Sequence, residues 1–331
     1  MGGVLLRSTH IPGRHCASSA ISDIVRFHGL DLSEAMCFGI GSGLGAWYLQ
    51  NVPNAPSRMI HVRSADIEAK FFKRIGCPFS WSRFPGADQA LDALRASLHR
   101  GLPTLVQTDI YYLGYYQSST HFPGHDIVVW GCDDQEGVFF VTDTERPDVI
   151  RVPSFELARS MFAEGGFFPM EGNSYAPEAI ATGIDLGGVI ERAIVSNSRL
   201  ILSEDLEFQG IAGLRLWLRE VKTSWPGLED WRWAARFAYQ VIERRGTGGG
   251  GFRIMYADFL DEAAPLCPAI AELGLGRMMR EASQAWTRLA LRLKEASEGD
   301  ADALGPVGES IEEVIERETA YHRNALRVTG R

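Results

Sequence analysis

The stretch GHDIVVWGCDDQEGVFFVTD, residues 124–143, decides the fold of the first half of the chain. Two short runs rich in Val, Ile, Phe and Trp lie on either side of a polar turn at 134–137, which is the pattern of an antiparallel β-hairpin. Similar runs occur at 103–110 and 149–153 and are bounded by turn residues. We therefore predict a block of short antiparallel strands in this part of the chain.

Helical patterns precede these strands. After Cys16, the segment ASSAISDIVRFHGL places apolar residues at helical spacing, and Gly29 is suited to end the helix. Helices followed by antiparallel strands predict an α+β domain, which we place at residues 1–155. Further helices are expected at 32–37, 64–75 and 87–100, with loop and extended chain over the glycine-rich 39–49.

The second half of the chain has a different pattern. From about Leu186 the periodicity is almost entirely helical, and Gly or Pro residues separate the segments. We predict an α-helical domain over residues 186–331, joined to the first domain by a linker or crossing segment at 156–185. The expected helices cover residues 186–199, 207–223, 229–245, 252–264, 268–296 and 307–327.

Composition narrows the possible functions. Of the 331 residues 45% are hydrophobic, enough for one large core or two ordinary ones. The formal net charge of −9 argues against a nucleic-acid partner, because phosphates favour a basic surface. No apolar run approaches the roughly 20 residues of a membrane helix, so we expect a cytoplasmic protein without a membrane partner. The five cysteines form no CxxC pair, so we expect no zinc site, no other metal and no cofactor.

Three residues of the first domain suggest nucleophilic catalysis. Cys16 lies just before the first long helix, where the positive end of the helix dipole stabilises a thiolate. His125 opens one strand of the hairpin and Asp143 closes the other. Pairing of these strands brings their ends together, and a thiolate, an imidazole and a carboxylate that orients the imidazole are the set that acyl chemistry needs.

Each of these residues also has a plainer interpretation. Cysteine is among the most buried residue types, so Cys16 could be a packing residue, which is the role we expect for the other four cysteines. His121 lies in the same loop as His125 and is a rival base. We favour His125 because it stands at the strand edge.

At these residues the sequence resembles a known family. RHCASSAISDIVRFHGLDLSEAMCFGIGSGLGAWY, residues 14–48, resembles the N-terminal domain of butirosin biosynthesis protein H. RGTGGGGFRIMYADFLDEAA, residues 245–264, resembles the domain of uncharacterised function that usually follows it. The helix that starts at Cys16, together with HDIVVWGCDD and FFVTD, also looks like papain-like peptidases of the bacteriocin-processing type.

The resemblance implies a papain-like catalytic domain and an acyltransferase of natural-product or antibiotic biosynthesis. In the type member an acyl group passes from an acyl-carrier-protein thioester to an amine on an aminoglycoside. Cys16 and His125 match the catalytic positions of the family, and Asp143 matches the expected third position. The implied partners are an acyl carrier protein, or another acyl thioester such as that of coenzyme A, and a small-molecule amine acceptor.

Papain-like peptidases usually place a Gln six residues before the nucleophile as a donor to the oxyanion. Here that position is His10, with Thr9 beside it. His10 could donate to the oxyanion together with the Cys16 backbone N–H, or it could be a loop histidine without a role.

Two further clusters invite a functional interpretation. The segment TDIYYLGYYQSST, residues 108–120, combines Asp109 with Tyr111, Tyr112 and two more tyrosines, and could form a pocket for an amine-bearing acceptor; ordinary strand-end tyrosines are the alternative. Basic residues gather within 58–74 and could dock an acidic carrier protein, or they could form a solvated face. These residues are Arg58, Arg63, Lys70, Lys73 and Arg74.

The first half of the reaction is common to two enzyme classes. An acyltransferase and a peptidase or amide hydrolase would both form an acyl-cysteine with the same triad. We favour acyl transfer, because an attached helical domain can exclude water and shape an acceptor pocket. A non-catalytic binding protein of the same fold is a third possibility, which the complete Cys16, His125 and Asp143 set argues against.

Overall fold

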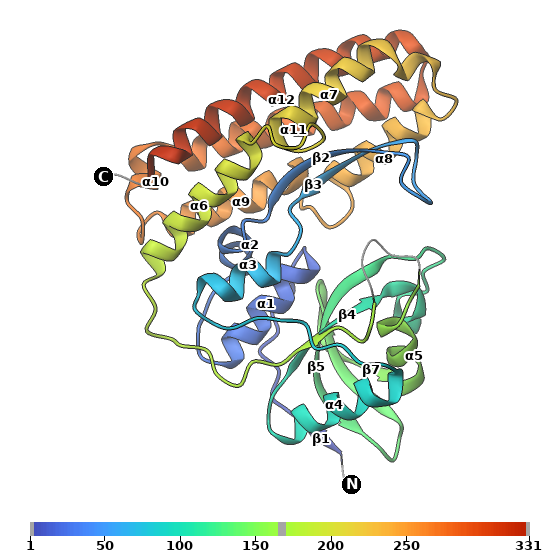
Figure 1. The fold of residues 1–331 in the computed structure, drawn as a ribbon, viewed down its shortest axis with the longest axis vertical. Coiled ribbons are helices and arrows are strands. Elements are labelled where there is room, and N and C mark those ends of the chain that lie inside the picture. Colours follow the sequence, from blue (N-terminus) through green and yellow to red (C-terminus); the bar gives the residue numbers. More distant parts are fainter. Residues whose placement is uncertain (1–2, 165–169, 329–331) are drawn as a thin grey trace. The chain divides into compact units, whose positions relative to one another are not determined.

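The computed structural model describes residues 3–164 and 170–328. The chain forms two compact units that interleave along the sequence (Figure 1). Unit 1 consists of Met1–Cys37 and Ile75–Ile184, and unit 2 of Phe38–Arg74 and Asp185–Arg331. Residues 38–74 therefore pack with the helical second half, which the expected boundaries at 155 and 186 do not anticipate.

Unit 1 contains an antiparallel sheet in the strand order β7-β6-β5-β4-β8, with β1 paired to the far end of β5. Four of its strands lie where the sequence predicts them, so the α+β fold class is confirmed. The two-residue β8 was not predicted, because so short a strand has no periodicity to detect. The strands are β1 (Val4–Leu5), β4 (Thr104–Asp109), β5 (Pro123–Asp133), β6 (Val138–Asp143), β7 (Arg146–Pro153) and β8 (Ser174–Tyr175).

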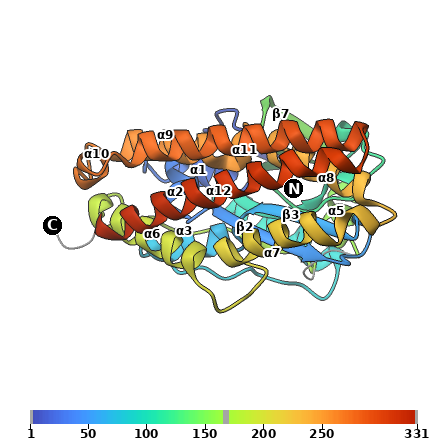
Figure 2. The same ribbon diagram turned by 90° about the horizontal axis from the view of Figure 1, so that it is seen from above.

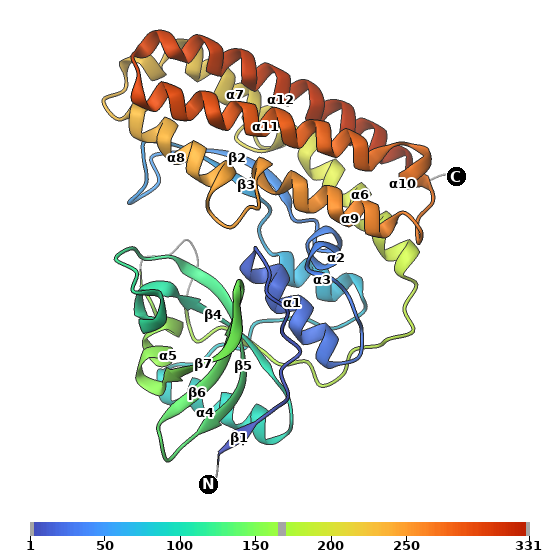
Figure 3. The ribbon, with the colours of Figure 1, turned by 180° about the vertical axis from the view of Figure 1, so that it is seen from behind.

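Helices cover both faces of this sheet because side chains alternate along its longest strand. Ile127 and Val129 of β5 belong to the core that contains α4 (Ala87–His99) and α5 (Ser154–Met161). On the other face, Trp130 makes an edge contact with Phe27, at the end of α1 (Cys16–Phe27), with 5.8 Å between ring centroids. Helix α1 packs along β5 (Figure 3), which brings the predicted nucleophile helix to the predicted hairpin.

Unit 2 is a set of helices that hold a small β-hairpin. The long helices α11 and α12 run side by side (Figure 2). Strands β2 (Leu44–Gln50) and β3 (Arg58–Arg63) pack against α7 and α8. The predicted helix 268–296 is divided into α10 and α11, with Gly274 between them at φ 63°. The helices are α6 (Leu186–Leu202), α7 (Gly210–Thr223), α8 (Trp231–Glu243), α9 (Arg253–Ala263), α10 (Ala269–Glu272), α11 (Leu275–Glu298) and α12 (Leu304–Ala325).

For the glycine-rich segment 39–49 we expected loop and extended chain, and the structure shows an extended strand over much of it. It forms the end of α2 (Glu34–Ile40) and most of β2. A Cβ atom on Gly39 would lie 2.1 Å from the Phe259 ring, and one on Gly45 would lie 2.3 Å from the Arg63 carbonyl oxygen. These glycines are needed for close packing inside unit 2.

The basic residues of 58–74 are largely used within unit 2. The Arg58 guanidinium pairs with Glu220. Arg74, at the end of α3 (Ile67–Arg74), donates to the Ile40 carbonyl and to Ser196, and Lys70 donates to the Ala65 carbonyl, at 2.6 Å. The proposed docking surface for a carrier protein is therefore mostly a set of internal contacts.

Candidate active site

Cys16 is the first residue of α1, as the sequence predicts. The residue before it, His15, caps the helix by accepting a hydrogen bond from the Ser18 amide at 3.3 Å. The Glu34 carboxylate accepts from the amides of Arg14 and His15, at 2.8 and 2.7 Å, and so fixes the chain that leads to the thiol. The helix terminus places positive backbone charge at the sulfur.

Cys16 differs from the other cysteines in its exposure. All five cysteines lie in the described part of the chain, where none of them forms a disulfide, and Cys16 alone is partly exposed. Burial raises the pKa of the Cys132 thiol and of the Cys267 thiol, which keeps these sulfurs protonated and unreactive.

The hairpin brings His125 and Asp143 together across adjacent strands. The His125 Nε2 lies 2.8 Å from Asp143 Oδ1, and the Cys16 thiol is hydrogen-bonded to the His125 side chain. Because Nε2 is bound to the carboxylate, Nδ1 is the ring nitrogen left for the thiol. His125 and Asp143 are 6% and 1% exposed, so their charges are screened little by solvent.

Burial and the neighbouring charges shift the pKa values of both His125 and Asp143. Burial by itself disfavours the imidazolium, but the Asp143 carboxylate and the Cys16 sulfur outweigh it and raise the pKa of His125 to about 10. Burial also disfavours the carboxylate, yet His125 and two tyrosine hydroxyls lower the pKa of Asp143 below its usual range. The arrangement thus favours an imidazolium between a carboxylate and a sulfur, which is the state that stabilises a thiolate.

Two tyrosines, which we expected only as members of the 108–120 cluster, support this pair. The Tyr115 hydroxyl donates to Asp143 Oδ2 at 2.7 Å, and the Tyr116 hydroxyl lies 3.1 Å from His125 Nε2. The Arg146 guanidinium lies over both rings, 4.9 and 5.1 Å from their centroids, and donates to the Tyr115 carbonyl. The sequence does not distinguish Tyr115 and Tyr116 from other adjacent tyrosines at a surface, so this role could not be predicted from it.

His10 is placed differently from the expected oxyanion donor. Its Nδ1 lies 2.7 Å from Asp23 Oδ2 and its Nε2 lies 3.0 Å from the Arg146 carbonyl oxygen. A carbonyl only accepts, so Nε2 donates, and both ring nitrogens are used inside the protein. The pKa of His10 is raised, since Asp23 outweighs the effect of burial.

His10 instead ties the chain before Cys16 to the turn after Asp143. The Gly13 amide adds a second bond to this turn, at 2.7 Å from the Thr144 carbonyl. Thr9, the other residue expected near the oxyanion, donates to the Asp23 carbonyl at 2.9 Å. The Cys16 backbone N–H, at the start of α1, remains our candidate for stabilising an oxyanion.

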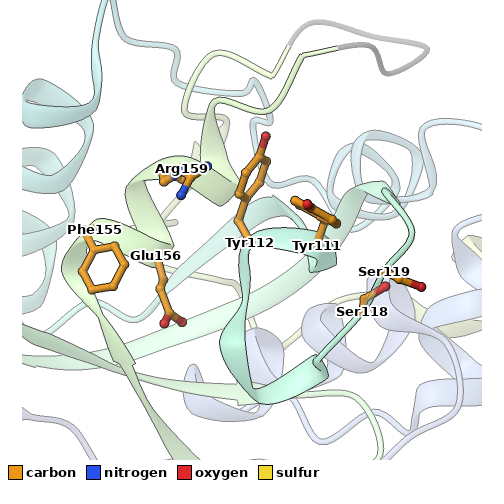
Figure 4. Close-up of a pocket in the computed structure, with 7 residues that line it drawn as sticks. All are labelled: Tyr111, Tyr112, Ser118, Ser119, Phe155, Glu156 and Arg159. Carbon is orange, nitrogen blue, oxygen red and sulfur yellow. The ribbon is translucent and has the colours of Figure 1, made fainter.

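Asp109 also has a structural role rather than the expected place in a pocket. It is fully buried and accepts hydrogen bonds from the amides of Tyr111 and Phe122 and from His121 Nδ1, at 2.7–3.0 Å. His121, the alternative candidate for the base, thus binds Asp109 through its Nδ1. Tyr111 and Tyr112 do line a pocket, of about 510 Å³, in which Glu156 supplies the carboxylate (Figure 4).

Two parts of the chain match known families. Residues 15–144 match the family described as butirosin biosynthesis protein H, N-terminal. Residues 155–325 match a domain of unknown function, DUF4872. The second match covers more than half of the chain, so the chain belongs to the DUF4872 family, and its first part matches the N-terminal domain of butirosin biosynthesis protein H. A search of curated proteins returned no match.

The butirosin biosynthesis protein H match contains Cys16, His125 and Asp143 in one segment, and the second match begins in α5. The first of these matches indicates an enzyme of natural-product biosynthesis, related to the butirosin system. Within residues 3–164 and 170–328, no helix is long and apolar enough to span a bilayer. The same ranges contain no group of three or more His, Cys, Asp or Glu side chains that could hold a metal ion.

Proposed function

We propose that this protein is a cysteine-dependent acyltransferase that moves an acyl group from a carrier-protein or coenzyme A thioester to an amine of a small molecule. The observation that carries the proposal is the cluster of Cys16, His125 and Asp143 at the start of α1 and at the ends of two paired strands. The match of residues 15–144 to the N-terminal domain of butirosin biosynthesis protein H also supports it. We expect the enzyme to act in the cytoplasm, where carrier-bound intermediates are made.

The first half-reaction replaces one thioester by another. The Cys16 thiolate attacks the carbonyl carbon of the donor, and the bond from that carbon to the donor sulfur breaks. The departing sulfur takes the proton from the His125 imidazolium, which leaves a neutral imidazole and an acyl-cysteine. Because a thioester is exchanged for a thioester, the step is nearly balanced in energy, and a thiolate is a suitable nucleophile for it.

The second half-reaction forms the amide. The amine attacks the acyl carbon and gives a proton to the neutral His125, which acts as general base. The carbon–sulfur bond then breaks, and the Cys16 thiolate returns next to an imidazolium. Asp143 keeps the ring in one orientation throughout, with Nε2 bound and Nδ1 toward the sulfur.

Intact-mass measurement tests the proposal directly. The protein is incubated with short-chain acyl thioesters of coenzyme A and of a carrier protein. We expect a covalent adduct with the mass of the acyl group, absent in Cys16→Ala and retained in Cys37→Ala and Cys267→Ala. An adduct of undiminished yield in Cys16→Ala would contradict the proposal.

The fate of the adduct separates transfer from hydrolysis. The isolated acyl-enzyme is mixed with buffer alone or with buffer plus primary amines, and the loss of the adduct is followed by mass. Transfer predicts slow loss in buffer and fast loss with a suitable amine, together with formation of the amide. Equally fast loss in buffer would indicate a hydrolase with the same triad.

A further inference from the structure

The pocket near the candidate active site has a composition that suits an anion. It lies between the short helical turn 110–112, the loop at 118–119 and the first turns of α5. Its lining combines three aromatic rings with a cation, a carboxylate and two serines (Figure 4). The residues are Tyr111, Tyr112, Ser118, Ser119, Phe155, Glu156 and Arg159.

The two charged residues of this pocket are not equally available to a ligand. Glu156 Oε2 accepts a hydrogen bond from the Gly114 amide at 2.9 Å, so the chain itself uses this carboxylate. Arg159 lies over the Tyr112 ring, 4.7 Å from its centroid. Among residues 3–164 and 170–328, no carboxylate forms an ion pair with Arg159, although Glu156 is only three residues away in α5. The guanidinium therefore keeps its donors for a ligand.

The hydrogen-bond donors of the lining also favour an anionic ligand. The side chain of Arg159 offers only donors, and hydroxyls of Tyr111, Tyr112 and Ser119 can donate as well. Guanidinium groups bind phosphate oxygens well, because their planar fork donates two parallel hydrogen bonds. The pocket is open to solvent at Phe155 and Tyr111, which are 65% and 43% exposed, so a charged group can bind there without full desolvation.

Two ring contacts, made by the neighbouring residues His121 and Phe122, connect the pocket with the candidate active site. Tyr111 stacks on His121 with 4.0 Å between ring centroids. The next residue, Phe122, makes an edge contact with His125 at 6.5 Å. All these residues belong to unit 1. A ligand that is anchored at Arg159 therefore has a path along this aromatic surface to the reacting histidine.

We propose that the pocket around Arg159 binds the phosphate of the phosphopantetheine arm that carries the acyl donor. This inference rests on the proposed function, because carrier-protein thioesters and coenzyme A thioesters share this arm. The phosphate binds at the open end of the pocket, on Arg159 and the neighbouring hydroxyls. The pantetheine chain then lies along Tyr111 and Phe122, and the thioester reaches Cys16.

Donors of graded length provide the test. Acylation of Cys16 is measured with one acyl group on a carrier protein, on coenzyme A, on phosphopantetheine, on pantetheine and on N-acetylcysteamine. We expect Arg159→Ala to raise KM about 10- to 100-fold for the three donors with a phosphate, since hydrogen bonds to charged groups have this strength. Pantetheine and N-acetylcysteamine donors, which lack the phosphate, should be affected less than about twofold.

Two variants serve as controls. Arg159→Lys keeps the charge but not the fork, and should lose only part of the affinity. Arg100→Ala removes another exposed arginine of unit 1, one that pairs with Glu178, and should leave KM unchanged for all donors. An equal loss for pantetheine and coenzyme A donors, or no loss for any of them, would overturn the phosphate site. A loss confined to the carrier protein would mean that Arg159 contacts the protein surface rather than the arm.

A binding measurement keeps this inference separate from the proposed function. Phosphopantetheine itself is titrated calorimetrically into the Cys16→Ala protein, which cannot be acylated. We expect binding that Arg159→Ala weakens by the same 10- to 100-fold and that inorganic phosphate at high concentration reduces. Acylation without phosphopantetheine binding would overturn the phosphate site alone, whereas binding without any acyl adduct would overturn the acyltransferase and leave the site.

Discussion

Each unit of the protein contains a buried histidine beside a carboxylate, and the two pairs differ in the charge of the histidine and in the residues around it. In unit 1 His125 bonds to Asp143 at 2.8 Å. In unit 2 His322 Nε2 lies 3.1 Å from Glu318 Oε2, within helix α12. The pKa of His125 is raised, whereas burial lowers the pKa of His322, an effect that Glu318 only partly offsets. At neutral pH the two histidines thus differ in charge: His125 is an imidazolium and His322 a neutral imidazole.

The difference comes from a third residue. Arg253 is fully buried beside Glu318, with its Nε 2.8 Å from Oε1, and already neutralises that carboxylate. Its other nitrogens donate to the carbonyls of Val62, Gly251 and Gly45, and the ring of Trp286 lies 4.7 Å away. Among residues 3–164 and 170–328, no arginine or lysine forms an ion pair with Asp143, whose cationic partner is His125. A saturated, permanently charged cluster stabilises a fold, and a cluster whose cation is a histidine next to a thiol can carry a proton.

The largest expected effect is the loss of catalysis in one histidine variant and not in the other. His125→Ala should slow acylation of Cys16 by about 10²- to 10⁴-fold, the usual contribution of an acid–base group. His322→Ala should leave the rate per folded molecule nearly unchanged. Rates are measured from intact mass at a saturating acyl thioester concentration, with circular dichroism as a check on folding. Similar loss in both variants would mean that the two clusters are not functionally distinct.

The second effect is on stability. Arg253→Met leaves Glu318 buried without its cation, and should lower the free energy of unfolding by about 3–5 kcal/mol. Urea unfolding followed by fluorescence measures it. The matched control is Arg236→Met, because Arg236 forms an exposed pair with Glu298 and such pairs contribute at most about 1 kcal/mol. If both variants lose the same amount, the buried network of unit 2 is not what stabilises that unit.

A smaller effect sharpens the role of the tyrosines in unit 1. Tyr115→Phe removes one hydrogen bond to the charged Asp143, and such bonds contribute about 1.5–3 kcal/mol. We expect kcat/KM for acylation to fall about 10- to 100-fold. Tyr239→Phe, in α8 of unit 2, is the control and should have no effect. An unchanged rate in Tyr115→Phe would show that the hydroxyl does not position the carboxylate.

The smallest effect is the pH dependence, which should have opposite signs in the two units. The raised pKa of His125 means that its ion pair stabilises unit 1 fully below the ordinary histidine pKa of about 6.5 and is lost as pH rises through about 10. The lowered pKa of His322 means that unit 2 keeps its full stability above about 6.5 and loses it as pH falls below that value.

Two titrations check these signs. The alkaline limb of acylation should move to lower pH in Asp143→Asn, because the imidazolium loses its carboxylate. The midpoint of urea unfolding of the wild type should fall between pH 7 and 5, and His322→Gln should remove much of this decline. If the alkaline limb of the acylation rate is the same in Asp143→Asn, the pH dependence does not come from the His125–Asp143 pair.

Much of the fold followed from local patterns. Strands β4 to β7 and most helices of the second half lie where periodicity and turn residues place them. The sequence was less informative where a segment had no amphipathic pattern of its own. The hairpin at 44–63 was not predicted as a pair of strands. Only 39–49 was expected, as loop and extended chain, and nothing in the local pattern shows that the Arg63 carbonyl packs against Gly45. The assignment of the hairpin to unit 2 depends on contacts with Glu220, more than 150 residues away.

The candidate site, like the fold, was predicted from the sequence only in part. The sequence by itself determined the three chemical groups and the elements that carry them: Cys16 begins a helix, and His125 and Asp143 lie at the ends of two paired strands. Only the tertiary structure decided what surrounds them. In the fold both ring nitrogens of His10 contact Asp23 and the Arg146 carbonyl, Asp109 is buried, and the hydroxyls of Tyr115 and Tyr116 contact Asp143 and His125. Periodicity arises from neighbours along the chain, whereas a polar side chain finds its partner by where the whole fold brings a donor or an acceptor.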